Sequence, residues 1–159
     1  MNEENKKLII SRIFDAPRER VWQAWTDPEM FKKWWGPKKY TAPDSKMDVQ
    51  VGGKYLASMQ GPDGKKIWSG GTYKEIIPME KLVLTDSFAD ENGNVVPSSH
   101  YGMPGMPLET QIVVTFEDEG GNTKMTVRHE GMAAQYQSDA SGGWNESFDK
   151  LAKTLKQFS

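Results

Sequence analysis

The sequence predicts an α+β fold in which one antiparallel sheet packs against a long C-terminal helix. Three patterns indicate this: two short helical segments follow a first strand, strand-like alternation fills the middle of the chain, and a long amphipathic segment ends it. A sheet with one apolar face needs a cover, and only the last helix is long enough to provide most of it. If the sheet curves around that helix, a cleft forms between them.

The N-terminal part predicts one strand and two short helices. Residues 6–14, KKLIISRIF, have the pattern of a strand. Pro17 stands at a favoured first helical position, and the apolar residues after it share one helix face up to Thr26. Asp27 is suited to cap a second helix, which Gly36-Pro37 ends. Three aromatic residues form the apolar face of this second helix: Phe31, Trp34 and Trp35.

The middle of the chain predicts a run of antiparallel strands. The expected strands cover residues 47–51, 54–60, 66–77 and 81–88, followed by a hairpin within residues 109–132 that turns at residues 119–122. Residues 89–107 lack a regular pattern and are rich in glycine and proline. A loop of this length suggests a lid or a mobile segment.

The last predicted element is a long amphipathic helix within residues 138–158. Its apolar residues recur at helical spacing, and its lysines fall mostly on the other side. The apolar positions are Trp144, Phe148, Leu151 and Leu155. Because no repeat, low-complexity segment or linker divides the chain, we expect a single domain over residues 1–159.

Composition argues against several classes of function. The 20 Lys and Arg residues nearly balance the 22 Asp and Glu residues, for a net charge of −2, and no basic block is present, so nucleic acid is an unexpected partner. There is no cysteine, and the two histidines have no ligand spacing, so neither a metal site nor a cofactor is expected. Without a signal-like N-terminus or an apolar span, we expect a cytoplasmic protein that does not cross a membrane.

Aromatic and methionine side chains are the candidate lining of a ligand site in the cleft. Flexible thioethers adapt to irregular apolar guests, although the same residues also serve as ordinary core packing. The candidate ligand-binding residues are Trp35, Met59, Trp68, Tyr73, Phe88, Tyr101, Met103, Met106, His129, Trp144 and Phe148. Two adjacent helical positions point about 100° apart, so Trp34 is expected to be scaffold while Trp35 borders the cavity.

Two polar residues fall on apolar strand faces and are candidate catalytic residues. By the two-residue period, Asp86 shares a face with Leu84 and Phe88, and His129 shares a face with Val127. A carboxylate and an imidazole in one apolar cavity could support proton transfer. The alternative is that both are structural groups, His129 hydrogen-bonded in the core and Asp86 near a strand end in water.

Five stretches in order resemble a known family over nearly the whole chain. They are FDAPRERVWQAWTDPEMFKKWWGP, the pair Gly52-Gly53, DGKKIWSGGTYKEIIPMEKLVLT, TKMTVRHEGM and GGWNESFDKLAKTL. Together they resemble the activator of heat-shock-protein-90 ATPase homologue-like family of the START and Bet v allergen-like (SRPBCC) superfamily. The resemblance implies a helix-grip fold, with a curved antiparallel sheet wrapped around the C-terminal helix and a cavity that in relatives holds lipids, sterols, polyketides or other apolar molecules.

This family is functionally diverse, so the resemblance leaves three hypotheses open. The first is a module that binds a small hydrophobic molecule in the cavity. The second is an enzyme of the cyclase, dehydrase or hydrolase type that uses Asp86 and His129 as acid and base. The third is a co-chaperone-like interaction module, with a protein partner or a second copy in a homo-dimer on the outer sheet face or the last helix.

Overall fold

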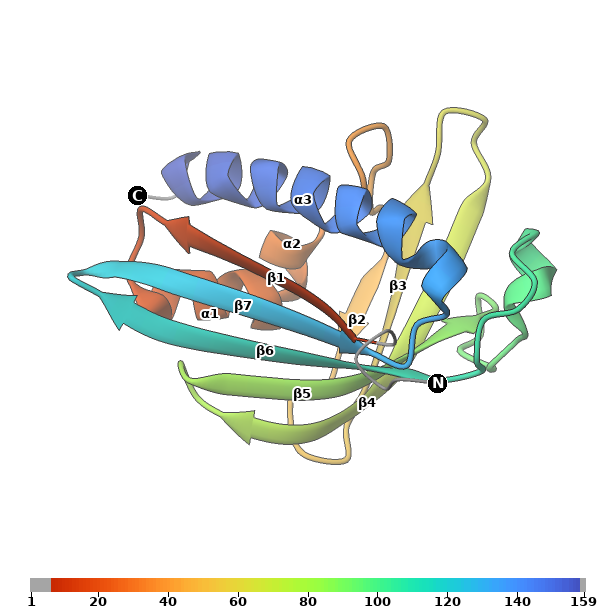
Figure 1. Cartoon of the computed structure of the whole chain (residues 1–159), viewed down its shortest axis with the longest axis horizontal. Helices are drawn as coiled ribbons and strands as arrows, with labels where there is room; N and C mark the ends of the chain where they lie inside the picture. Colours follow the sequence, from red (N-terminus) through yellow and green to blue (C-terminus); the bar gives the residue numbers. More distant parts are fainter. Residues whose placement is uncertain (1–6, 158–159) are drawn as a thin grey trace.

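The computed structural model of the chain describes residues 7–157 and shows one antiparallel sheet with helices on its inner face (Figure 1). The elements in chain order are β1 (Lys7–Phe14), α1 (Arg18–Thr26), α2 (Pro28–Phe31), β2 (Ser45–Met47), β3 (Lys54–Gln60), β4 (Lys66–Ile77), β5 (Lys81–Ala89), a 3-10 helix (Ser98–Tyr101), β6 (Thr110–Glu119), β7 (Asn122–Glu130) and α3 (Ala134–Gln157).

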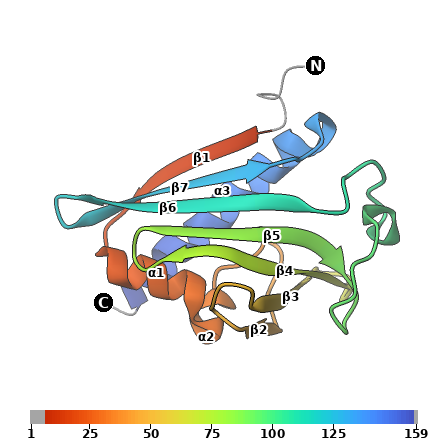
Figure 2. The same ribbon diagram turned by 90° about the horizontal axis from the view of Figure 1, so that it is seen from below.

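The sheet has seven strands in the order β1-β7-β6-β5-β4-β3-β2, and every neighbouring pair is antiparallel. The first strand therefore pairs with the last, which brings both halves of the chain into one sheet. Figure 1 shows the sheet curving beneath α3, and Figure 2 shows α3 crossing diagonally behind the strands. This arrangement confirms the predicted α+β helix-grip fold with two short helices after the first strand.

Several element boundaries differ from the sequence prediction. The strand expected at residues 47–51 is instead Ser45–Met47, because the chain then turns: Gly53 N–H bonds Gln50 O, and Gly52 adopts a φ of 87°. Val51 is 66% exposed, so this apolar residue lies on the surface and not in the core, as the predicted strand would have placed it. The helix α3 begins at Ala134 rather than near residue 138, and the expected start of the first strand at Lys6 lies outside the described residues.

The second helix is also shorter than its aromatic pattern indicated. Asp27 caps it by accepting a hydrogen bond from the Glu29 amide at 2.9 Å, as expected from its side chain. The helix ends at Phe31, and hydrogen-bonded turns carry the chain on to Trp35. The three aromatic residues thus span a helical turn and a tight turn instead of one continuous helix face.

An aromatic cluster joins the three helices at the closed end of the fold. The ring of Trp25 lies 4.8 Å from Trp34 and 6.1 Å from Trp144, between the centroids. Trp34 is fully buried and donates its indole N–H to Ala24 O at 2.9 Å. Because its one polar atom is satisfied, Trp34 packs as scaffold. Trp25 of α1 contacts Phe31 of α2 and Trp144 of α3, so the three helices are held together around Trp25.

A glycine pair allows the long strand β4 to bend over the inner face. A Cβ atom on Gly71 would lie 2.0 Å from the carbonyl oxygen of Thr85 on β5, a distance that real atoms do not reach. The neighbouring Thr72 amide donates to the Thr85 hydroxyl at 2.9 Å instead of extending the backbone ladder. The backbones of β4 and β5 therefore approach more closely here than a side chain would permit.

We expect Gly71→Ala to destabilise the protein by about 1–3 kcal/mol, because the added methyl group must push β4 and β5 apart. The matched control is Gly142→Ala in α3, where an added Cβ meets nothing within 4 Å. That control should stabilise the protein by up to about 1 kcal/mol through helix propensity. Urea unfolding of both variants measures the two values, and a neutral Gly71→Ala would contradict the close approach.

Candidate functional site

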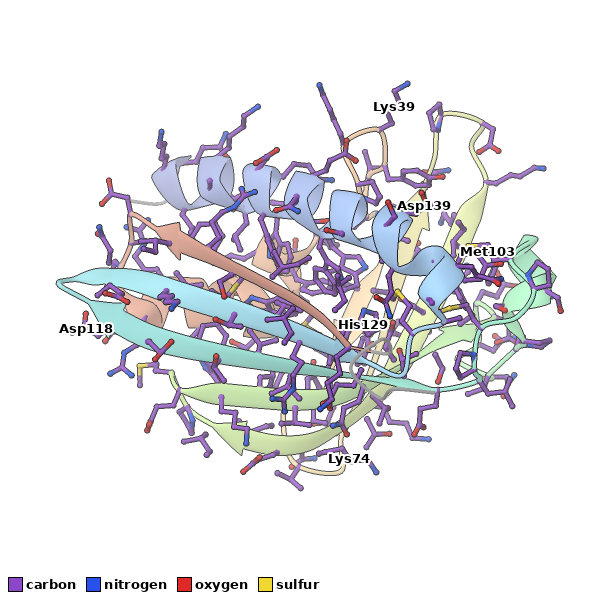
Figure 3. The ribbon with its side chains drawn as sticks, in the orientation of Figure 1. Lys39, Lys74, Met103, Asp118, His129 and Asp139 are labelled. Carbon is purple, nitrogen blue, oxygen red and sulfur yellow. The ribbon has the colours of Figure 1, made fainter. Side chains whose placement is uncertain are left out.

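A cavity lies beneath the N-terminal half of α3, at the end of the fold that the aromatic cluster does not fill. It consists of a space of about 450 Å³ and an adjoining space of about 160 Å³ that share much of their lining. Its walls come from α3, the inner sheet face, the turn after α2 and the loop of residues 90–107. In Figure 3, His129 lies below this part of the helix and Met103 beside its first turns.

Most of the cavity wall is apolar. The apolar side chains in it are Trp35, Met59, Ile67, Phe88, Met103, Met106, Met132 and Trp144. Four of these are methionines from β3, the loop of residues 90–107 and the turn before α3. The wall can therefore adapt its shape to an apolar guest with little rearrangement of the backbone.

The structure brings seven of the eleven sequence-selected ligand residues to this cavity. These seven are Trp35, Met59, Phe88, Met103, Met106, His129 and Trp144. The other four are placed elsewhere. Trp68 alternates with the cavity-lining Ile67 and lies on the outer sheet face, where Lys66 stands over its ring at 5.6 Å. Phe148 is fully buried against Phe14.

Two tyrosines of the sequence-selected set have structural contacts outside the cavity. Tyr73 is 2% exposed and packs against Tyr55, with 5.9 Å between ring centroids. Tyr101 donates its hydroxyl hydrogen to Ala89 O and accepts the Trp68 amide at 3.2 Å. Tyr101 thus fastens the loop of residues 90–107 to the ends of β4 and β5.

Asp86 and His129 do face inward, and their side chains meet in the cavity wall. The Asp86 Oδ2 atom lies 3.8 Å from His129 Nε2, which is too long for a hydrogen bond. Asp86 Oδ1 accepts the hydroxyl hydrogen of Tyr55 at 2.9 Å. Oδ2 is therefore the carboxyl atom left available to the cavity.

Both ring nitrogens of His129 are engaged by neighbouring side chains. The Trp144 indole, which can only donate, points its N–H at Nδ1 at 3.3 Å. Thr110 Oγ1 lies 2.9 Å from Nε2 and donates its own hydrogen to the Asp86 carbonyl oxygen at 3.1 Å. Nδ1 must then be the acceptor and Nε2 must carry the proton, so these contacts select one neutral tautomer.

The electrostatic environment favours neutral forms of this group of side chains. Burial raises the pKa of the Asp86 carboxyl above 3.8, against the opposing effects of His129 and the Tyr55 hydroxyl. Burial also lowers the pKa of His129 below 6.5, against the opposing effect of Asp86. Burial and the nearby Asp86 charge raise the pKa of Tyr55 well above 10, so Tyr55 stays a donor.

The sequence reasoning missed Tyr55 and Thr110, although a signal for each was present. Tyr55 lies four positions before Met59 on β3 and therefore on the same face. Thr110 lies two positions before Ile112 on β6, on the same face. Extending the alternation to the strand ends would have placed both beside Asp86 and His129.

A lysine from α3 holds the segment that forms one lip of the cavity. Lys150 Nζ donates to three backbone carbonyls, Trp35 O at 3.5 Å, Pro37 O at 3.2 Å and Tyr40 O at 3.0 Å. Partial burial lowers the pKa of this ammonium group, and Glu146 opposes that shift. The turn after α2 is thereby tied to the helix that roofs the cavity.

Two further features bear on the type of site. Within residues 7–157, no cluster of three or more His, Cys, Asp or Glu side chains is arranged to hold a metal ion. None of the helices in that range is long and apolar enough to cross a membrane.

A curved antiparallel sheet gripping a C-terminal helix above an apolar cavity defines the helix-grip class of proteins. The family model described as "Activator of Hsp90 ATPase homolog 1-like protein" matches residues 15–156, and the chain belongs to this family. No curated protein matches the sequence significantly.

Solved structures share this architecture. A protein from Arthrobacter aurescens is 28% identical with a TM-score of 0.81, covering 99% of this chain and 90% of that one. A protein from Chromobacterium violaceum is 25% identical with a TM-score of 0.79, covering 94% of this chain and 96% of that one. The AHSA1 protein of Silicibacter pomeroyi is 19% identical with a TM-score of 0.76, covering 96% of this chain and 99% of that one. At this identity, the comparison supports a shared fold and no more.

We expect His129 to be neutral at pH 7, with its proton on Nε2, and to titrate below pH 6.5. Because the pKa of His129 is lower in the folded protein than in the unfolded chain, the unfolded chain takes up the proton first as the pH falls. The free energy of unfolding should therefore decrease as the pH drops below 6.5. Nitrogen-15 NMR of a His100→Gln variant, in which His129 is the remaining histidine, reports both tautomer and midpoint. A proton on Nδ1 would contradict the hydrogen-bond assignment.

We expect Asp86→Asn to raise the free energy of unfolding at pH 7 by about 1 kcal/mol. The pKa of Asp86 in the folded protein lies above 3.8, so the wild-type protein loses stability as the pH rises from 3.8 through that folded value. The Asp86→Asn variant has no carboxyl group at this position and does not show this loss. The gain should therefore shrink as pH is lowered. Urea unfolding across pH checks this, with the exposed Asp139→Asn as control. A pH-independent loss of stability would mean that the charge is not the source of the effect.

Proposed function

We propose that the protein binds a small hydrophobic molecule in the cavity between α3 and the sheet. The observation that carries the proposal is an apolar, methionine-rich wall that converges on one available carboxyl oxygen, Asp86 Oδ2. A volume of about 450 Å³ falls within the usual size of ligand sites, which combine much apolar surface with few polar groups. Membership of a helix-grip family, a fold that commonly binds hydrophobic ligands, supports the same reading.

In this proposal the loop of residues 90–107 acts as a lid. It contributes Met103, Met106 and Pro107 to the cavity wall. Its described contacts with α3 centre on one carbonyl, Pro104 O, which accepts hydrogen bonds from Gln135 and Tyr136. So small an attachment allows the loop to open while Tyr101 keeps its other end in place.

A second candidate function is an enzyme of the cyclase, dehydrase or hydrolase type. The observation that favours it is an inward-facing carboxyl group, Asp86, whose pKa is raised by burial, since buried carboxyl groups of this kind can take part in proton transfer. His129 is a poorer choice of partner, because using either ring nitrogen would break its bond to Trp144 or to Thr110. The third hypothesis, a protein-interaction module, draws on the family description alone.

The ligand-binding proposal is tested by filling the cavity from its roof. Gly143 lines both parts of the cavity, and its Cβ position has only an ordinary contact, 3.5 Å from Pro37 Cγ. We expect Gly143→Leu to fold normally and to weaken binding of a neutral bicyclic probe, 2-(2-naphthyl)ethanol, by at least about tenfold, since a leucine side chain occupies the space the probe needs. Titration calorimetry measures the affinity, and circular dichroism checks the fold.

Gly142→Leu is the matched control, because it adds the same side chain one position away where nothing lies within 4 Å. It should leave the affinity unchanged. In the wild-type protein, hydrogen exchange in residues 90–107 should slow when the probe binds. Undiminished binding by Gly143→Leu would overturn the cavity as the binding site, and unchanged exchange in the loop would overturn its role as a lid.

A further inference from the structure

We propose that the preferred occupant of the cavity is a lipophilic amine, whose protonated nitrogen pairs with the free carboxyl oxygen of Asp86 while its apolar body fills the methionine-lined space. This inference rests on the proposed function and adds the charge of the ligand to it. It follows from the placement of charge in the cavity.

The described part of the cavity lining contains acidic groups and no fixed cation. Among residues 7–157, the side chains that line the cavity include no lysine and no arginine. The two charged residues in the lining are Asp86 and Asp139, and Figure 3 shows Asp139 on the part of α3 that roofs the cavity. A cavity with only negative charge in a low-dielectric wall attracts cations and disfavours carboxylates and phosphates.

No lysine or arginine within the described residues 7–157 pairs with Asp86. The other ion pairs with lysine or arginine described for the chain lie away from the cavity floor. His129 is the one nearby group able to become positive. Protonating its Nδ1 would set an N–H against the Trp144 indole N–H, which has no lone pair to accept it. The imidazole is therefore held neutral beside the carboxyl group.

Among the oxygen atoms of Asp86, Oδ2 is the one available to a ligand. Its Oδ1 is occupied by the Tyr55 hydroxyl, and its backbone oxygen is occupied by Thr110. Its side chain is only 22% exposed and lies in the cavity lining, with Oδ2 beyond hydrogen-bonding distance of His129. An ionised carboxyl group in an apolar site is costly unless paired, and an ammonium group from the ligand would supply both the charge and the hydrogen bond it lacks.

The cavity wall suits the apolar body of such an amine. The aromatic residues Trp35 and Phe88 border the same space as Asp86, as does Tyr136 at the start of α3. Aromatic rings attract cations as well as apolar groups, so they stabilise an amine that a purely aliphatic wall would bind less tightly. The chemical class is thus an apolar or aromatic body with one primary or secondary amine.

Three probes of similar size test the inference: 2-(2-naphthyl)ethylamine, 2-(2-naphthyl)ethanol and the carboxylate of 2-naphthylacetic acid. We expect the amine to bind roughly ten- to a hundredfold more tightly than the alcohol, the usual gain from a hydrogen bond to a charged group, and the carboxylate to bind most weakly. Asp86→Asn should reduce the amine to the affinity of the alcohol without changing the alcohol. Glu117→Gln removes an equal charge from the outer sheet face and should leave all three affinities unchanged.

The outcomes separate this inference from the proposed function. If none of the three probes binds the wild-type protein, the proposed function itself is overturned. If the alcohol binds and the amine binds no more tightly, the hydrophobic site stands and the amine preference is overturned. An amine preference that survives Asp86→Asn would also overturn the assignment to this carboxyl group, and unfolding curves of the variant confirm that it is folded.

A proton balance gives a second readout that a merely structural role for Asp86 would not produce. Pairing with an ammonium group lowers the pKa of Asp86, so binding of the amine should release a proton from the fraction of molecules in which the carboxyl is protonated. The titratable groups facing Asp86 are Tyr55 on β3 and His129 on β7, with Asp139 on α3 lining the same cavity. Calorimetry in two buffers of different ionisation enthalpy should show release with the amine and none with the alcohol or with Asp86→Asn.

Discussion

The packing of Trp25 on α1 against aromatic residues of α2, of the turn after α2 and of α3 is the interaction on which the rest of the structure depends. It joins α1, the turn after α2 and α3 into one layer and fills one half of the space that the curved sheet encloses. Since α3 is anchored there by Trp144, its other half projects over a part of the sheet that no short helix covers. The cavity is the space left by this uneven filling, and Trp35 lies at the boundary between the two halves.

The polar group at the cavity floor illustrates a conflict between folding and function. An apolar residue at Asp86 would complete the inner face of β5, which otherwise carries Leu82 and Leu84. Instead, Tyr55 and Thr110 supply the hydrogen bonds that keep the carboxyl group and its backbone in position. Three strands thus contribute to holding a group that burial disfavours. Such an arrangement is typical of a site retained for what it binds rather than for the stability of the fold.

The sequence predicted the fold well, because helical and strand periods are set by local geometry. The same two-residue period correctly placed Asp86 and His129 on the inner face. It also shows why one other expectation could not hold: Trp68 and Tyr73 are five positions apart on one strand and must face opposite sides. The positions of Met103 and Tyr101 could not be derived, because their loop has no period and its path depends on contacts with β4, β5 and α3. The contact between Trp144 and His129 likewise depends on where the helix crosses the sheet.

Lys150 has a consequence for how the proposed binding site can change during evolution. Its ammonium group bonds backbone oxygens of Trp35, Pro37 and Tyr40 and none of their side chains. The path of this lip therefore depends in part on a residue of α3 that is more than a hundred positions away in the sequence. Residues such as Tyr40 are free to be exchanged without loss of that anchor. A substitution at the lip can thus change the side chains around the cavity while the backbone that presents them stays in place.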